Sequence, residues 1–231
     1  MKRPFGFRAQ VRAYVNFVEG KKLARIKALA KYPRRGGILF LGDSLTEEFP
    51  FGELLPEFPI VGRGYSGDTA SMLRERLPYT CTPYAPAAVF LQAGINDLQR
   101  GASPEETARS VGEALIAVRK LCPGAKLHLL ALYPVNCSSE KFSLFRPKAF
   151  SKREALTLIS RTNTLLREEA AARGAEFHDF GDVLRDGGGE LREEFSCDGL
   201  HLTVEGYHSL SEALRPALAH YQQRSDQEGS K

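Results

Sequence analysis

The stretch GGILFLGDSL, residues 36–45, decides the fold of this chain. Its apolar run from Ile38 to Leu41 has the length of one buried strand, and the letters GDSL at residues 42–45 follow it directly. An apolar strand without polar alternation is typical of a parallel sheet that helices cover on both faces. We therefore expect residues 37–41 to form a strand of such a sheet, with a polar turn at its carboxyl end.

Similar runs alternate with helical patterns along the rest of the chain. Further strands are expected at residues 59–61, 87–93, 126–132 and 175–180. Helices are expected at 104–121, where Ser103 and Glu106 have the spacing of a capping box, and at 151–173. Strands that alternate with helices imply right-handed crossovers and a helix-covered parallel sheet.

Polar segments follow the strands at the rim where such sheets bind ligands. The first three are residues 42–44, 62–68 and 94–97, and the sequence Asp198-Gly199-Leu200-His201 lies near the C-terminus. A serine hydroxyl becomes a good nucleophile when an imidazole takes its proton and a carboxylate orients that imidazole. Ser44, His201 and Asp198 are therefore a candidate catalytic triad.

In these motifs the chain resembles the GDSL or SGNH hydrolase family, whose marker residues are a Ser, a Gly, an Asn and a His in that order. By this resemblance Ser44 is the nucleophile, Gly67 and Asn96 are oxyanion-hole residues, and Asp198 and His201 complete the triad. The family's second block usually opens with an Asn, whereas this chain has Gly62 there.

The resemblance extends from about residue 38 to about residue 218 and implies a domain organisation. The expected fold is α/β, a three-layer α/β/α domain with a flavodoxin-like five-stranded parallel sheet, the SGNH hydrolase fold. We expect a basic helical extension packed on the domain at residues 1–36, the hydrolase domain at 37–222 and a polar tail at 223–231.

The chemistry of these residues is that of ester hydrolysis. Attack on an ester carbonyl creates an oxyanion, which the backbone N–H groups of Ser44 and Gly67 and the side-chain amide of Asn96 would stabilise. Gly67 suits this role because a residue without a Cβ lets the backbone approach the substrate and adopt a positive φ. No metal ion or organic cofactor is expected.

The sequence predicts a serine esterase for carboxylic esters with short acyl groups, such as acetyl groups on a carbohydrate. Lysophospholipase or thioesterase-like hydrolysis and acyl transfer remain alternatives with the same residues. A non-catalytic carbohydrate-binding module is a remote alternative, which the complete triad argues against. The glycines at residues 62, 64 and 67 also match a dinucleotide-binding fingerprint, but the next strand ends in neutral residues instead of the required acid.

Substrate selection is assigned to the long connection at residues 133–150. Loops of this length are commonly lids or binding loops. Aromatic side chains in the loop can line a pocket or anchor the loop to the body. The candidate substrate-binding residues are Asp43, Asp68, Asn136, Phe142 and Phe145.

Composition and charge limit the cellular compartment and the kinds of binding partner that we expect. No apolar run is long enough to cross a bilayer, no signal-like apolar region follows Met1, and the four cysteines have no paired spacing, so we expect a cytoplasmic protein with reduced thiols. The first 35 residues hold 11 Lys or Arg against Glu19 alone, a charge of +10, while 21 basic and 27 acidic residues leave −6 on the remainder. Peripheral contact of this segment with an anionic membrane stays open, whereas no nucleic-acid-binding motif accompanies the charge.

Overall fold

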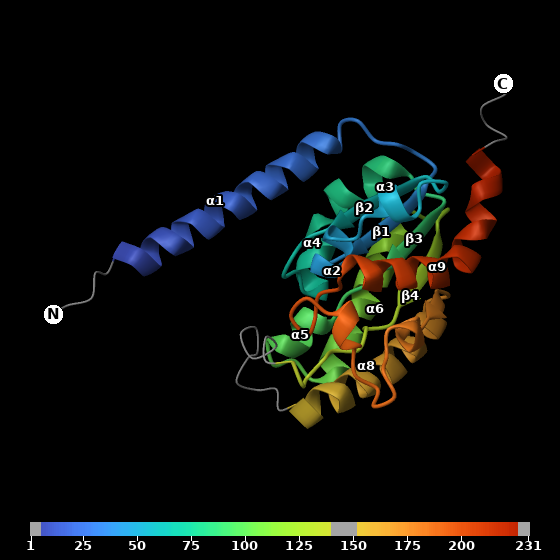
Figure 1. Ribbon diagram of the computed structural model, residues 1–231. Coiled ribbons are helices and arrows are strands. Elements are labelled where there is room, and N and C mark those ends of the chain that lie inside the picture. The colour runs from blue at the N-terminus through green and yellow to red at the C-terminus, as the bar shows by residue number, and fades with distance from the viewer. Residues whose placement is uncertain (1–5, 140–151, 226–231) are drawn as a thin grey trace, which may run out of the picture.

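A five-stranded parallel sheet forms the centre of the computed structural model, which describes residues 6–139 and 152–225 (Figure 1). The strand order is β2-β1-β3-β4-β5, and every neighbouring pair is parallel. The order reverses beside β1, which is the flavodoxin-like arrangement predicted from the sequence. The strands are β1 (Ile38–Gly42), β2 (Ile60–Gly64), β3 (Ala88–Leu91), β4 (Lys126–Leu130) and β5 (Glu176–His178).

Helices cover both faces of the sheet, so the predicted three-layer architecture is confirmed. Helix α6 begins as predicted, because the Ser103 side chain accepts the Glu106 N–H and the Glu106 side chain accepts the Ser103 N–H. The α-helices are α1 (Gly6–Leu29), α2 (Ser44–Glu47), α3 (Phe51–Leu54), α4 (Ala70–Thr80), α5 (Ile95–Gln99), α6 (Pro104–Leu121), α8 (Lys152–Ala172) and α9 (Val204–Ser225). Short 3₁₀ turns occupy η1 (Thr82–Tyr84), η2 (Gly181–Val183) and η3 (Glu193–Phe195).

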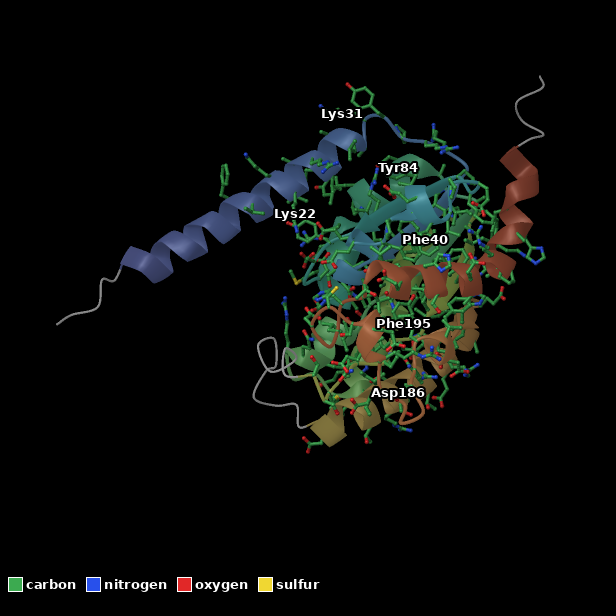
Figure 2. The ribbon with its side chains drawn as sticks, in the orientation of Figure 1. Lys22, Lys31, Phe40, Tyr84, Asp186 and Phe195 are labelled. Atoms are coloured by element: carbon green, nitrogen blue, oxygen red, sulfur yellow. The ribbon has the colours of Figure 1, made fainter. Side chains whose placement is uncertain are left out.

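Alternate side chains of the central strands fill two apolar cores. Leu39 and Leu41 belong to the core that β1 forms with α4, α6 and α8, whereas Ile38 and Phe40 belong to the core on the opposite face, with α3 and α9. Phe40 lies well inside the body in Figure 2, and α9 crosses in front of the sheet in Figure 1. Burial on both faces explains why these strands have no polar alternation.

The second strand differs most from its predicted position. It was expected at residues 59–61 but extends over Ile60–Gly64, because its pairing with β1 continues as far as Gly42 opposite Gly64. The residues Gly62, Arg63 and Gly64 have low strand propensity and resemble a loop in the sequence. Pairing with the neighbouring strand overrides this local preference.

The basic N-terminal segment forms one long helix, α1, that only partly contacts the domain. Lys22 binds Glu47 at 3.0 Å and the Lys27 ammonium lies over the ring of Tyr79, whereas the N-terminal part of α1 projects beyond the body (Figures 1 and 2). These two contacts come from the C-terminal part of α1. In the ranges that the structure describes, no helix is both long and apolar enough to span a membrane.

At the other end of the chain, helix α9 continues through residue 225, past the expected domain boundary at 222. Three residues of the predicted polar tail are therefore helical.

Candidate active site

Three neighbouring strands carry the predicted motifs to one edge of the sheet. Ser44 begins α2 directly after β1, the 65–68 turn follows β2, and Asn96 lies in α5 after β3. Since β2, β1 and β3 are adjacent, their carboxyl ends bring these segments together. The loop with His201 precedes α9, which is tied to α2 because the Tyr207 hydroxyl donates to the Leu45 carbonyl at 3.0 Å.

The turn that presents Ser44 is stabilised by its own sequence. Asp43 is the N-cap of α2, and its carboxylate accepts the Leu45 N–H at 3.0 Å. Gly64 on β2 permits the close approach of this turn. A Cβ at position 64 would lie 2.1 Å from the backbone nitrogen of Glu47 and 2.5 Å from the backbone carbonyl oxygen of Asp43. A side chain at position 64 would push α2 away from the sheet.

Ser44, His201 and Asp198 form a continuous hydrogen-bonded chain. The His201 Nε2 lies 2.9 Å from the Ser44 Oγ, and the His201 Nδ1 lies 2.6 Å from the Asp198 Oδ2. The second oxygen, Asp198 Oδ1, accepts the N–H groups of Leu200 and His201 at 2.9 and 2.8 Å. The structure thus brings together all three residues of the predicted triad, with the histidine between the hydroxyl and the carboxylate.

Asp198 is held in its ionised form. Burial alone would raise the pKa of this carboxyl group, but the hydrogen bonds from the His201 ring and from the His201 and Leu200 N–H groups outweigh it and keep the pKa below the ordinary value. A charged acceptor at Nδ1 keeps the proton of a neutral imidazole on that nitrogen. The lone pair of Nε2 then faces the serine hydroxyl, as a general base requires.

The predicted oxyanion-hole residues lie beside one another. The Asn96 Nδ2 donates to the Asp68 carbonyl at 3.0 Å, which holds the side-chain amide against the turn that carries Gly67. Gly67 has a φ of +79°, a conformation that favours glycine. These contacts give Gly67 and Asn96 fixed positions at the same edge as Ser44.

Three charged residues that the sequence analysis did not identify support this turn. The Glu47 carboxylate accepts the N–H of Ser66 at 2.7 Å and also binds the Ser66 hydroxyl. Arg100 donates to the Gly67 carbonyl at 2.8 Å, and Arg76 makes two 2.7 Å bonds to the Asp68 carboxylate. The partners come from different elements, so no local sequence pattern indicates them.

The residues predicted to contact substrate at positions 43, 68 and 136 are buried and have partners within the protein. The two aspartates are 1% exposed, and Asn136 is 7% exposed with its amide on the Leu191 carbonyl. The backbone N–H of Asn136 also donates to the Gly199 carbonyl at 2.7 Å, so this residue supports the loop of the triad. Their intramolecular partners give these residues a structural role, and their contact with substrate stays a prediction.

Phe142 and Phe145, the two aromatic candidates in the long connection, lie outside the described residues. So does the rest of the expected lid from residue 140 to residue 150. The structure describes residues 133–139 of this connection, of which residues 133–137 are buried. The proposed role of the loop in substrate selection stays a prediction.

Gly62 and Gly64 have structural roles that differ from those of a dinucleotide-binding loop. Both lie inside strand β2, whereas the fingerprint needs them in the turn after a strand. A Cβ at position 62 would lie 2.9 Å from the ring of Phe51, so this ring fills the space where the family's usual Asn would stand.

The chain is similar to known proteins in sequence and in structure. The sequence pattern of the GDSL-like Lipase/Acylhydrolase family matches residues 40–208. A Streptococcus pneumonia protein provisionally named a platelet activating factor has a similar structure, with 28% identity, a TM-score of 0.81 and coverage of 93% of this chain and 100% of that chain. A comparison with curated protein sequences found no match.

Two more distant structures share the fold. A GDSL-like lipase from Bacteroides thetaiotaomicron has 21% identity and a TM-score of 0.68, and the alignment covers 87% of this chain and 97% of that one. An acetyl-xylooligosaccharide esterase from Geobacillus Stearmophilus has 18% identity and a TM-score of 0.58, with coverage of 80% and 96%.

Proposed function

Because this chain belongs to the GDSL-like lipase and acylhydrolase family, we propose that it is a serine esterase in which Ser44, His201 and Asp198 are the catalytic triad. One observation carries the proposal, namely the placement of the His201 ring 2.9 Å from the Ser44 hydroxyl and 2.6 Å from the Asp198 carboxylate. A histidine in this position can remove the serine proton while the carboxylate stabilises the imidazolium that forms.

The reaction proceeds in two steps. The Ser44 Oγ attacks the ester carbonyl as its proton moves to the His201 Nε2, and the resulting oxyanion is stabilised by the Ser44 and Gly67 N–H groups and the Asn96 amide. The imidazolium then protonates the leaving alkoxide, which leaves Ser44 acylated. A water molecule that gives a proton to the same imidazole hydrolyses this acyl-enzyme and restores the free hydroxyl.

The acyl group in this proposal is short, such as an acetyl group on a carbohydrate. The cavity lined by Asp43, Leu45, Leu132 and Leu200 behind the GDSL turn has a volume of about 10 Å³, roughly the space of one water molecule. This cavity is therefore too small to hold a long acyl chain. Structures that share the fold include proteins named for acetyl-ester substrates, which supports the same choice.

A lipid ester with a longer acyl chain is the second candidate, and the basic N-terminal helix favours it. Lys22 of α1 binds Glu47, the residue that holds the 65–68 turn through Ser66. A membrane or micelle bound by this positively charged helix would therefore lie close to the active-site edge. Acyl transfer to an alcohol would use the same residues as hydrolysis.

Two measurements test the proposal. Fluorophosphonate should label the wild-type chain and the control Ser160→Ala, whose serine is exposed on α8, but it should not label Ser44→Ala. The absence of label from the wild type would contradict the triad and favour the non-catalytic binding module. p-Nitrophenyl esters of increasing acyl length, tested beside acetylated sugars and a lysophospholipid, then separate the two substrate classes, because the first candidate requires a maximum at the acetyl ester.

A further inference from the structure

Two histidines and a glutamate lie together on the sheet face beneath α9. His128 stands on β4, and Glu176 and His178 stand two residues apart on the edge strand β5. The register places His128 directly opposite Glu176, with Leu130 opposite His178. Since residues two apart on a strand point to the same side, all three side chains meet on one face.

The ligand atoms of these side chains face a common point. The His128 Nδ1 lies 2.9 Å from the His178 Nε2 and 3.6 Å from the Glu176 Oε2, and the His178 Nε2 lies 3.7 Å from the Glu176 Oε1. We propose that His128, Glu176 and His178 form a binding site for one divalent transition-metal ion, with zinc as the preferred ion. This site is independent of the proposed esterase function.

The distances match the size of such an ion. With Zn–N and Zn–O bonds of about 2.1 Å and tetrahedral angles, two ligand atoms of one zinc ion lie about 3.4 Å apart. Each histidine nitrogen already lies near this separation from one oxygen of Glu176, Oε2 for His128 and Oε1 for His178. The two histidine nitrogens, now 2.9 Å apart, need to move apart by about half an ångström. The Glu176 side chain is 66% exposed, so it can adjust, and a water molecule would be the fourth ligand.

The histidine rings are held in ligating orientations by their neighbours. The His128 Nε2 lies 2.6 Å from the Tyr221 hydroxyl of α9, which leaves Nδ1 directed at the cluster. The His128 ring stacks on Phe90 with a centroid distance of 4.2 Å, and the His178 ring stacks on Phe180 at 5.5 Å. A partner on the second nitrogen is a usual feature of histidine ligands, because it fixes the tautomer.

The protonation state of the rings also suits metal binding. Burial lowers the pKa of His128 to about 4 and lowers the pKa of His178 as well. Both imidazoles are therefore neutral near pH 7, which is the form that coordinates a metal. In the metal-free chain one ring proton lies in the hydrogen bond between the two histidines. When an ion binds, that ring changes tautomer and carries the proton on its other nitrogen, so both imidazoles stay neutral.

The ion would join the edge strand to the rest of the domain. β5 has three residues and lies at the end of the described sheet, beside β4. A metal bound by both strands, with Tyr221 of α9 on the second nitrogen of His128, connects all three elements. We infer a structural site, which binds the ion only in the folded state and so raises the melting temperature.

The test uses the full chain without an affinity tag, freed of metal with EDTA and titrated with zinc. The wild type should bind one zinc ion per chain and melt at a higher temperature with zinc, and cobalt should give the intense visible bands of a tetrahedral site. His178→Gln should lose stoichiometric binding, and Glu176→Gln, which changes an exposed side chain, should bind at least about tenfold more weakly. Tyr221→Phe keeps the ring but removes the hydroxyl and should weaken binding by about ten- to a hundredfold.

His220→Gln is the matched control, because His220 is an exposed histidine on the same helix as Tyr221. It should bind zinc like the wild type. The proposal is overturned if the wild type binds no stoichiometric zinc, if Glu176→Gln and His178→Gln retain full affinity, or if binding is lost with His220. Circular dichroism of each metal-free variant distinguishes a lost ligand from a lost fold.

Discussion

The buried carboxyl group of Asp43 makes the stability of the fold depend on pH. This side chain is 1% exposed, and burial raises its pKa from 3.8 to about 7, despite the hydrogen bond from the Leu45 N–H. The folded state then binds this proton more tightly than the unfolded state does, so the free energy of unfolding falls as pH rises from about 4 to about 7. An interval of about three pH units corresponds to about 4 kcal/mol, all of which is lost above about pH 7.

Asp43→Asn removes the ionisation while its side-chain oxygen can still accept the Leu45 N–H. The free energy of unfolding of the variant, minus that of the wild type, should therefore increase by up to about 4 kcal/mol between pH 4 and pH 8. Urea denaturation followed by circular dichroism at a series of pH values measures this difference. Asp182→Asn is the control, because the Asp182 side chain is 90% exposed, and its curve should run parallel to that of the wild type. A constant difference between Asp43→Asn and the wild type across this range would refute the reasoning.

Steady-state kinetics on a p-nitrophenyl ester check the remaining predictions. Ser44→Ala and His201→Ala should each abolish hydrolysis without loss of the fold, and the double variant should be scarcely worse, because the two act as a unit; additive losses would contradict the triad. Asn96→Ala should lower kcat by about a hundred- to a thousandfold with little change in KM, since the amide matters most once the oxyanion forms; a change in KM alone would make Asn96 a binding residue. Asp198→Asn should lower kcat by up to about ten-thousandfold, because the imidazole loses the acceptor that holds its tautomer; a near-normal rate would assign the orienting role to another carboxylate.

Local sequence patterns predict much of the fold. The apolar run at residues 38–41, the capping box of Ser103 and Glu106, and the alternation of strands with helices depend on interactions between residues close in sequence. The sequence does not predict that β2 ends at Gly64. This end depends on pairing with Gly42 of the neighbouring strand, which overrides the low strand propensity of the local residues. The residues of the N-terminal segment predict a helix. They do not predict how far this helix projects from the body.

The sequence by itself determined which residues gather at the active-site edge. Parallel strands end at the same edge of their sheet, so Ser44, Gly67 and Asn96 meet once the strands are identified, and an Asp three residues before a His can orient it within one loop. Only the tertiary structure decided which polar groups are buried and which are paired at long range. The burial of Asp43 and the support of Ser66 by Glu47 depend on segments that no local pattern connects.

The cluster of His128, Glu176 and His178 depends on tertiary structure most strongly. Its three side chains meet only because β4 and β5 pair with His128 opposite Glu176. A slip of one residue along either strand would move its ligands to the other face of the sheet, since successive side chains alternate between faces. Strand register is decided by the packing of the whole core, and for this reason the cluster is visible in the folded protein and not in the sequence.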